Sequence, residues 1–259
     1  MGAIDTYVAF LDEILETTGF VRHAGVLKSR IGPIVHWDAA GDLRPTLRAY
    51  LDSKPVEDRV YQSFLVAAHA GFEQFVSALL EDACELVSKK RMASAEVEKR
   101  MPGLLSKFRR ASGSALAASL SPRDHWKIDY DGLVESLATT HAASSMSNVL
   151  GRIFVVEARS IDKEGLQKQL DTIGYRLSWD EVGKKPLFQK ILSTSGTRDT
   201  SKAASELLDQ LCSRRNALAH SQGALSVGGD ELETFLAYYR ALAEHVAASA
   251  LAFVSKQLK

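Results

Sequence analysis

The chain lacks several residue patterns that would point directly to a function. Its two cysteines lie far apart, at positions 84 and 212, and its seven histidines are scattered, so no zinc-ligand spacing is present. The 32 basic and 32 acidic residues leave no net charge, which argues against a general polyanion binder. A Walker loop, a dinucleotide fingerprint and a Gly-x-Ser-x-Gly nucleophile elbow are all missing. We therefore expect no bound metal and no cofactor.

Long apolar runs are missing as well. No uninterrupted apolar stretch reaches the roughly 18 residues that a membrane-spanning helix needs, and we find no signal-peptide pattern. Hydrophobic residues make up 46% of the 259 and charged residues 25%, the balance of an ordinary globular protein. Cys84 and Cys212 sit among apolar residues at helical spacing, as small buried residues do in a reducing compartment. These features predict a cytoplasmic protein with no membrane contact.

Helical periodicity dominates what remains. The strongest segment runs from about residue 57 to 90, more than 30 residues without proline and with apolar side chains at helical spacing. Two further helices are predicted, one ending near residue 220 and one covering about 230–256. We expect the segments 57–90 and 199–258 to form the core. The helix that ends near residue 220 has Asp199 or Thr200 as its predicted N-cap. The last helix has a predicted capping box of Asp230 with Glu233.

The other segments have weaker patterns. Residues 4–17 fit one amphipathic helix, whereas residues 20–55 are mixed. The pattern over residues 91–198 predicts a set of shorter helices that elaborates the core. Two of those helices are expected at 130–157 and 163–174. Since no strand pattern and no repeat occurs, the predicted fold class is all-α, one domain over residues 1–259 built as a helical bundle with N-terminal and central elaborations.

One segment interrupts the apolar stripe of the helix that ends near residue 220. With residues 204–220 placed at about 100° per residue, the apolar side chains share a face, and Arg215 falls in the middle of it. A cation in that position is costly unless its charge is paired or the face meets an anion. Asn216 and His220, four residues apart, share the neighbouring face. The segment therefore offers a fixed cation, an amide and a titratable imidazole.

The long helix carries a second irregularity, at the border of its apolar stripe. His69 and Glu73 are four residues apart there, so they lie on one side of the helix. We expect Glu73 to be the carboxylate that holds Arg215. Plainer interpretations stay open. Arg215 can form a structural ion pair, or extend its charged end to solvent. His220 can interact with the dipole at a helix C-terminus, and His69 can fill space between helices. Glu73 can be an ordinary boundary residue.

The sequence Arg215-Asn216-x-x-x-His220, in the penultimate predicted helix, resembles the Arg-x(4–6)-His motif of the HEPN superfamily (higher eukaryotes and prokaryotes nucleotide-binding). Residues 70–75, Ala-Gly-Phe-Glu-Gln-Phe, resemble the aromatic-Glu-x-aromatic pattern of an early helix in these proteins. Residues 161–174 look like a connector in the RiboL-PSP-type branch. The resemblance covers roughly residues 57–90 and 160–255, and it leaves 1–55 and 91–160 without a counterpart.

The resemblance implies a metal-independent endoribonuclease that acts as a homodimer, with two motifs facing each other across the dyad. A ribose 2′-OH attacks the adjacent phosphate of the RNA substrate and leaves a 2′,3′-cyclic phosphate and a 5′-OH. Arg215 would bind the phosphate, His220 would move a proton, and Asn216 would orient one of the two. Glu73 and His69 would support them. Since one histidine cannot easily be base and acid in one step, the dimer would supply the second.

Proteins of this kind are often toxins or anti-phage defence effectors, so the resemblance also implies an antitoxin or a defence-system protein as a partner. Two other functions fit the same residues. One is a non-catalytic HEPN-like module that binds RNA, a nucleotide or a protein, and the other is a helical interaction protein in which the motif is coincidental. If RNA binds, Arg109, Arg110 and Arg214 are the candidate phosphate contacts outside the motif. Basic pairs of this type are more often solvated helix faces.

Overall fold

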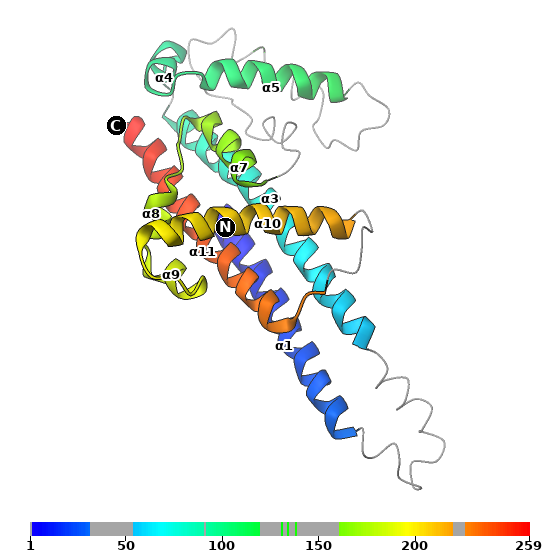
Figure 1. Cartoon of the computed structure of the whole chain (residues 1–259). Helices are drawn as coiled ribbons and strands as arrows, with labels where there is room; N and C mark the ends of the chain where they lie inside the picture. The colour runs from blue at the N-terminus through cyan, green and yellow to red at the C-terminus, as the bar shows by residue number, and fades with distance from the viewer. Residues whose placement is uncertain are drawn as a thin grey trace.

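The computed structural model describes most of the chain, and its regular structure is helical. The described residues are 2–31, 54–90, 92–119, 161–219 and 226–259, with Asp131, Val134 and Ala138. Every regular element in this part of the chain is a helix, so the all-α prediction is confirmed (Figure 1). The predicted helix at 130–157 lies outside the described residues, apart from three single positions.

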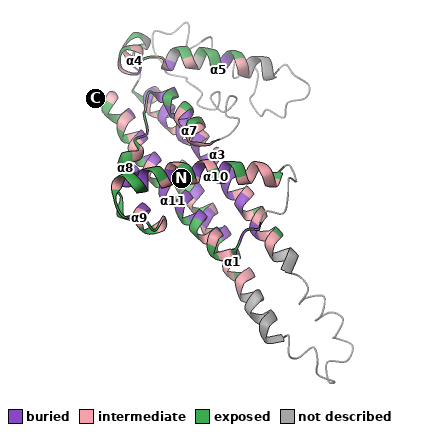
Figure 2. Ribbon diagram, viewed as in Figure 1, coloured by how far each residue is buried: buried purple, intermediate pink, exposed green. Residues whose placement is uncertain are grey.

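Three long helices form the centre of the molecule, and each packs against the other two. They are α1 (Ala3–Ile31), α3 (Lys54–Lys89) and α11 (Gly229–Gln257). Helix α10 (Thr197–Ala219) crosses this group and packs on α3 (Figure 1). Figure 2 shows buried residues where these helices meet. Cys84 and Cys212 are both buried, as predicted, and burial raises the pKa of the Cys84 thiol to about 12.

Shorter helices flank this centre. They are α4 (Ser94–Arg100), α5 (Leu104–Ser119), α7 (Lys163–Leu170), the 3-10 turn η4 (Asp171–Ile173), α8 (Trp179–Gly183) and α9 (Pro186–Ile191). Helices α7 and α8 both pack on α10, and α5 packs on η4. Asp162 caps α7 by accepting a hydrogen bond from the backbone nitrogen of Gly165 at 2.7 Å. Where the structure describes residues 91–198, the predicted elaboration is this set of short helices.

The first helix is longer than the sequence predicts. The pattern favoured a helix over 4–17 and a mixed segment from residue 20, but α1 continues to Ile31. Thr18 is fully buried, and its hydroxyl donates to the carbonyl four residues earlier at 2.8 Å. Packing against α3 and α11 therefore carries the helix through Gly19, where intrinsic helix propensity is poor.

Both predicted helix caps are wrong. Helix α10 begins two residues before Asp199, so Asp199 and Thr200 lie inside its first turn. Helix α11 follows a glycine, and no side chain caps it. The expected capping box does not form because α11 begins at Gly229, which places Asp230 inside the helix. Asp230 and Glu233 instead form ion pairs with Arg22 of α1, the Glu233 pair at 3.0 Å. A contact between helices has replaced a contact within one helix.

Helix α3 is strongly apolar and lies in the centre of the helical bundle. By length and composition its segment Asp58–Lys89 can cross a membrane, although the core helix of a soluble protein passes the same test. Here the helix packs against α1, α10 and α11, and Leu65, Phe72 and Leu79 are fully buried. Those contacts bury part of the apolar surface of α3 within the helical bundle.

Helix α8 approaches α10 so closely that only a glycine fits at its end. A β-carbon added at Gly183 would lie 2.2 Å from the hydroxyl oxygen of Ser201 and 2.3 Å from the carbonyl oxygen of Thr197. Both neighbours belong to the first turns of α10, the helix that carries Arg215. The exposed Gly113 of α5 differs, because nothing described lies within 4 Å of its added β-carbon.

We expect Gly183→Ala to lower the free energy of unfolding by about 1–3 kcal/mol, since the new methyl group must push α8 away from α10. The matched variant Gly113→Ala should raise it by about 0.5–1 kcal/mol, because alanine favours an exposed helix. Urea unfolding of both variants measures the two changes. Equal effects of the same sign would contradict the close α8–α10 contact.

Candidate functional site

The centre of the candidate site is the point where α10 meets α3. Arg215 of α10 and Glu73 of α3 form an ion pair there, with Nη2 of the arginine 3.4 Å from Oε2 of the glutamate. The two side chains are 26% and 24% exposed. The predicted pairing is therefore present. It explains how a cation can occupy the apolar face of α10, because a carboxylate compensates its charge.

Asn216 fixes the same guanidinium from the other side. Its Oδ1 accepts a hydrogen bond from Nη1 of Arg215 at 3.0 Å, and its Nδ2 lies 3.7 Å from the sulfur of the buried Cys212. The sequence suggested that Asn216 orients either the imidazole or a phosphate oxygen; in the described structure it orients Arg215. A guanidinium has five N–H donors, so its Nη groups keep hydrogens beyond those that Glu73 and Asn216 accept.

His69 lies deeper than the predicted site residues around it. It is fully buried on α3, and its Nδ1 lies 2.7 Å from the hydroxyl of Tyr239 on α11. Its Nε2 lies 3.5 Å from Oε1 of Glu73, and neither of these two buried atoms has a hydrogen-bond partner among the described residues. His69 therefore fills the space between α3 and α11, as the plainer interpretation held, while it also faces Glu73.

Tyr239 forms the buried end of this cluster. Burial raises the pKa of the Tyr239 hydroxyl well above its ordinary value, so the phenol stays protonated. Its oxygen lies within hydrogen-bond distance of Nδ1 of His69, and Nε2 of the same ring lies toward Glu73. We call the series Tyr239, His69, Glu73, Arg215 and Asn216 the polar chain. It connects α11, α3 and α10.

Of the predicted catalytic residues, the structure brings Arg215 and Asn216 together with both supporting residues. His220 lies outside the described residues, because the described part of α10 ends at Ala219. Sequence reasoning missed Tyr239. Its neighbour Tyr238 is also buried, and both lie on the apolar side of α11, so they look like ordinary core residues. Only the rule that a buried hydroxyl needs a partner could have suggested a polar role.

The three arginines predicted to contact RNA have different environments. Arg214 forms an ion pair with Glu231 at 2.5 Å and lies over the ring of Phe235 at 5.4 Å, so it ties α10 to α11. Arg109 is exposed on α5. Arg110 follows it and lines a small cleft between α5 and α7.

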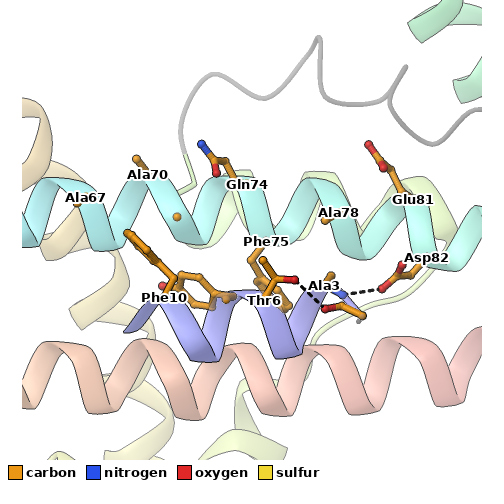
Figure 3. Close-up of a pocket in the computed structure, with 13 residues that line it drawn as sticks. Ala3, Thr6, Phe10, Ala67, Ala70, Gln74, Phe75, Ala78, Glu81 and Asp82 are labelled. Atoms are coloured by element: carbon orange, nitrogen blue, oxygen red, sulfur yellow. Dashed lines mark hydrogen bonds between the residues drawn. The ribbon is translucent and has the colours of Figure 1, made fainter. Parts of the chain in front are cut away.

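A cavity of about 560 Å³ lies elsewhere, between α1 and α3 (Figure 3). Its α3 wall includes the small side chains of Ala67, Ala70 and Ala78, with Phe10 of α1 opposite them. Neither His69 nor Glu73 lines it, so the cavity is on a different face of α3 from the polar chain. Over the described part of the chain, no group of three or more His, Cys, Asp or Glu residues is placed to hold a metal ion.

No protein-family model matches this chain, and no curated protein or solved structure matches it either. The resemblance to the HEPN superfamily therefore rests on the residues of this chain alone, and membership stays a prediction. The contacts of Arg215 are independent of that resemblance, because they follow from the packing of α10 on α3.

The Glu73–Arg215 pair should show up as coupled stability changes. We expect the variants Glu73→Gln and Arg215→Met, alone and together, to give a coupling free energy of about 1–2 kcal/mol, because each single variant leaves one poorly solvated charge behind. Urea unfolding of the four proteins measures it. The exposed pair Asp12–Arg240 is the matched control and should couple by less than about 1 kcal/mol. Additive effects at Glu73 and Arg215 would disprove the pairing.

The hydroxyl of Tyr239 should matter more than its ring. We expect Tyr239→Phe to lower the free energy of unfolding by about 1–3 kcal/mol, since it leaves Nδ1 of the buried His69 without a partner. Tyr175→Phe is the control, because no described hydrogen bond uses that hydroxyl, and its effect should stay below about 0.5 kcal/mol. Thermal or urea unfolding distinguishes them, and a Tyr239→Phe protein as stable as the control would contradict the polar chain.

Proposed function

We propose that this protein is a metal-independent endoribonuclease of the HEPN type. The observation that carries the proposal is the arrangement around Arg215. Glu73 and Asn216 hold the guanidinium in one orientation, while 26% of the side chain remains exposed. A guanidinium held in this way suits a phosphate, because its planar donors match two phosphate oxygens. In the sequence, His220 follows Arg215 by five residues.

In the proposed reaction, the 2′-oxygen of a ribose attacks the adjacent phosphorus and gives its proton to a base. The bond from phosphorus to the 5′-oxygen of the next nucleotide breaks, and that oxygen takes a proton from an acid. The products carry a 2′,3′-cyclic phosphate and a 5′-OH. Arg215 stabilises the negative charge that builds up on the phosphoryl oxygens. His220 exchanges protons, since a histidine ordinarily titrates at about pH 6.5.

The need for a base and an acid favours a homodimer. His69 is unsuited to be the second proton-transfer group, because it is fully buried and bonded to Tyr239. It is better regarded as a positioning residue that acts through Glu73. A second chain would contribute another His220 across a twofold axis. In this proposal the protein is a cytoplasmic toxin or anti-phage effector, controlled by an antitoxin or another defence-system protein.

One observation favours a second candidate, a non-catalytic module that binds RNA, a nucleotide or a protein. Glu73 already compensates much of the charge of Arg215, and Asn216 is occupied by the same guanidinium. A cation that is paired in this way can stabilise the structure without taking part in any reaction. Cleavage and binding must therefore be measured separately.

Cleavage of total RNA in the presence of EDTA tests the enzyme. We expect the full chain to cut RNA, and we expect Arg215→Ala and His220→Ala each to slow cutting by at least about 100-fold, as the loss of a charge-stabilising or proton-transferring group does. Arg198→Ala is the matched control, because it removes an exposed arginine from the same helix roughly 25 Å away. It should cut within about twofold of the unchanged protein.

The alternatives give distinct results in the same assay. Cutting that persists in both site variants would indicate a contaminating nuclease and would overturn the proposal. RNA binding without cutting by the unchanged protein would favour the non-catalytic module. A strict monomer in solution that still cuts RNA would contradict the composite dimeric site.

A further inference from the structure

Glu73 places a negative charge beside the cation that the proposed reaction uses. Helix α10 crosses α3 (Figure 1), and Oε2 of Glu73 lies 3.4 Å from Nη2 of Arg215 where the two helices meet. An RNA phosphate that contacts this guanidinium comes close to the carboxylate as well. Like charges at such short range repel, more strongly in a partly buried site than in water. Glu73 therefore opposes the binding of RNA at the same time as it supports Arg215.

The ion pair uses only part of each charged group. Among the described residues, Nε of Arg215 and Oε1 of Glu73 are buried and have no hydrogen-bond partner. The pair is thus a single contact through Nη2, not the two parallel hydrogen bonds of a fully paired arginine and carboxylate. Oε1 of Glu73 lies 3.5 Å from Nε2 of His69 instead. Because the carboxylate is shared in this way, it compensates the charge of Arg215 only in part.

The contacts of Arg215 also fix its orientation. Over the described part of the chain, its guanidinium contacts Glu73 through Nη2 and Asn216 through Nη1. Each Nη nitrogen carries two hydrogens, so one on each nitrogen is left for a phosphate oxygen. Since 26% of the side chain is exposed, RNA can reach it. Glu73 and Asn216 together set the direction in which these remaining hydrogens point.

Charge and orientation affect different steps. The binding of a flexible RNA strand depends on the charge near its phosphates. The transition state also needs the guanidinium in one orientation toward the phosphoryl oxygens. Without Glu73, the long arginine side chain would be free to take many conformations. Its uncompensated charge would bind RNA more strongly, but its lost orientation would slow the chemical step.

We infer that Glu73 is a positioning residue that lowers the affinity of the protein for RNA and raises the rate at which bound RNA is cut. It acts through Arg215 in both respects. The effect on affinity requires only that an RNA phosphate contacts Arg215, whereas the effect on rate rests on the proposed function. Removing the charge of Glu73 should strengthen binding, although removing that of Arg215 should weaken it.

Two substitutions separate the charge of Glu73 from its position. Glu73→Gln removes the charge and keeps the length of the side chain, whereas Glu73→Asp keeps the charge and shortens the side chain. Fluorescence anisotropy measures binding of the full chain to a labelled single-stranded RNA with 2′-O-methyl riboses, which cannot form a cyclic phosphate. We expect Glu73→Gln to tighten binding about fivefold at about 0.1 M salt and to steepen the salt slope by about 0.7, the effect of gaining one phosphate contact. Glu73→Asp should bind within about twofold of the unchanged protein, since the number of charges is the same.

Cutting of unmodified RNA is measured separately, at saturating RNA. We expect both Glu73 variants to cut at least about tenfold more slowly, because Arg215 is no longer held in place. Asp12→Asn is the matched control, since it removes the carboxylate of an exposed pair with Arg240, and it should change affinity and rate by less than about twofold. In an Arg215→Met protein, Glu73→Gln should change affinity by less than about twofold, because the arginine through which it acts is missing. Thermal unfolding of each variant checks that it is folded.

The other outcomes separate this inference from the nuclease. Unchanged or weaker binding by Glu73→Gln, or equal tightening by Asp12→Asn, would overturn the inference, while cutting by the unchanged protein would keep the nuclease. Tightening that persists in the Arg215→Met protein would contradict action through Arg215. Undiminished cutting by both Glu73 variants would refute the positioning role. If the unchanged protein does not cut RNA but Glu73→Gln binds it more tightly, the nuclease is contradicted and the effect of Glu73 on affinity stands.

Discussion

The site depends on one ion pair, between Glu73 of α3 and Arg215 of α10. A guanidinium on the packing face of a helix is costly unless a carboxylate compensates it, and the pair does this where the two helices cross. Behind Glu73 stands His69, which Tyr239 orients from α11. Three helices therefore fix one cation. Packing that positions α10, such as the close approach of α8, becomes part of the geometry of the site.

The sequence was informative where one residue broke a strong pattern. Arg215 interrupts an apolar stripe, so a partner was required, and Glu73 at the border of the longest helix was the natural choice. Tyr239 could not be found in this way, because a tyrosine among apolar residues fits the pattern of a core. The predicted helix caps are wrong because both helices begin before the expected cap residues. Arg22, some 200 residues away in the sequence, pairs with Asp230 and Glu233, and no local pattern reveals that contact.

The small cleft between α5 and α7 shows the same limit of local patterns. Arg109 and Arg110 form one pair in the sequence, and nothing distinguishes them there. Helix geometry separates them, because only Arg110 shares a face with Lys107 and meets Lys168 from a segment far along the chain. Gln169 and Thr172 resemble surface residues until η4 buries them.

The most direct test of the nuclease proposal is the chemistry of the cut ends. An RNA and its fully 2′-O-methylated copy are incubated with the protein in EDTA, and the products are identified by mass spectrometry. We expect fragments of the unmodified RNA with a 2′,3′-cyclic phosphate at one end and a 5′-OH at the other, and no cutting of the methylated copy, because it has no 2′-OH to attack phosphorus. Cutting of the methylated copy, or 5′-phosphate ends, would contradict the proposed role of Arg215 and His220.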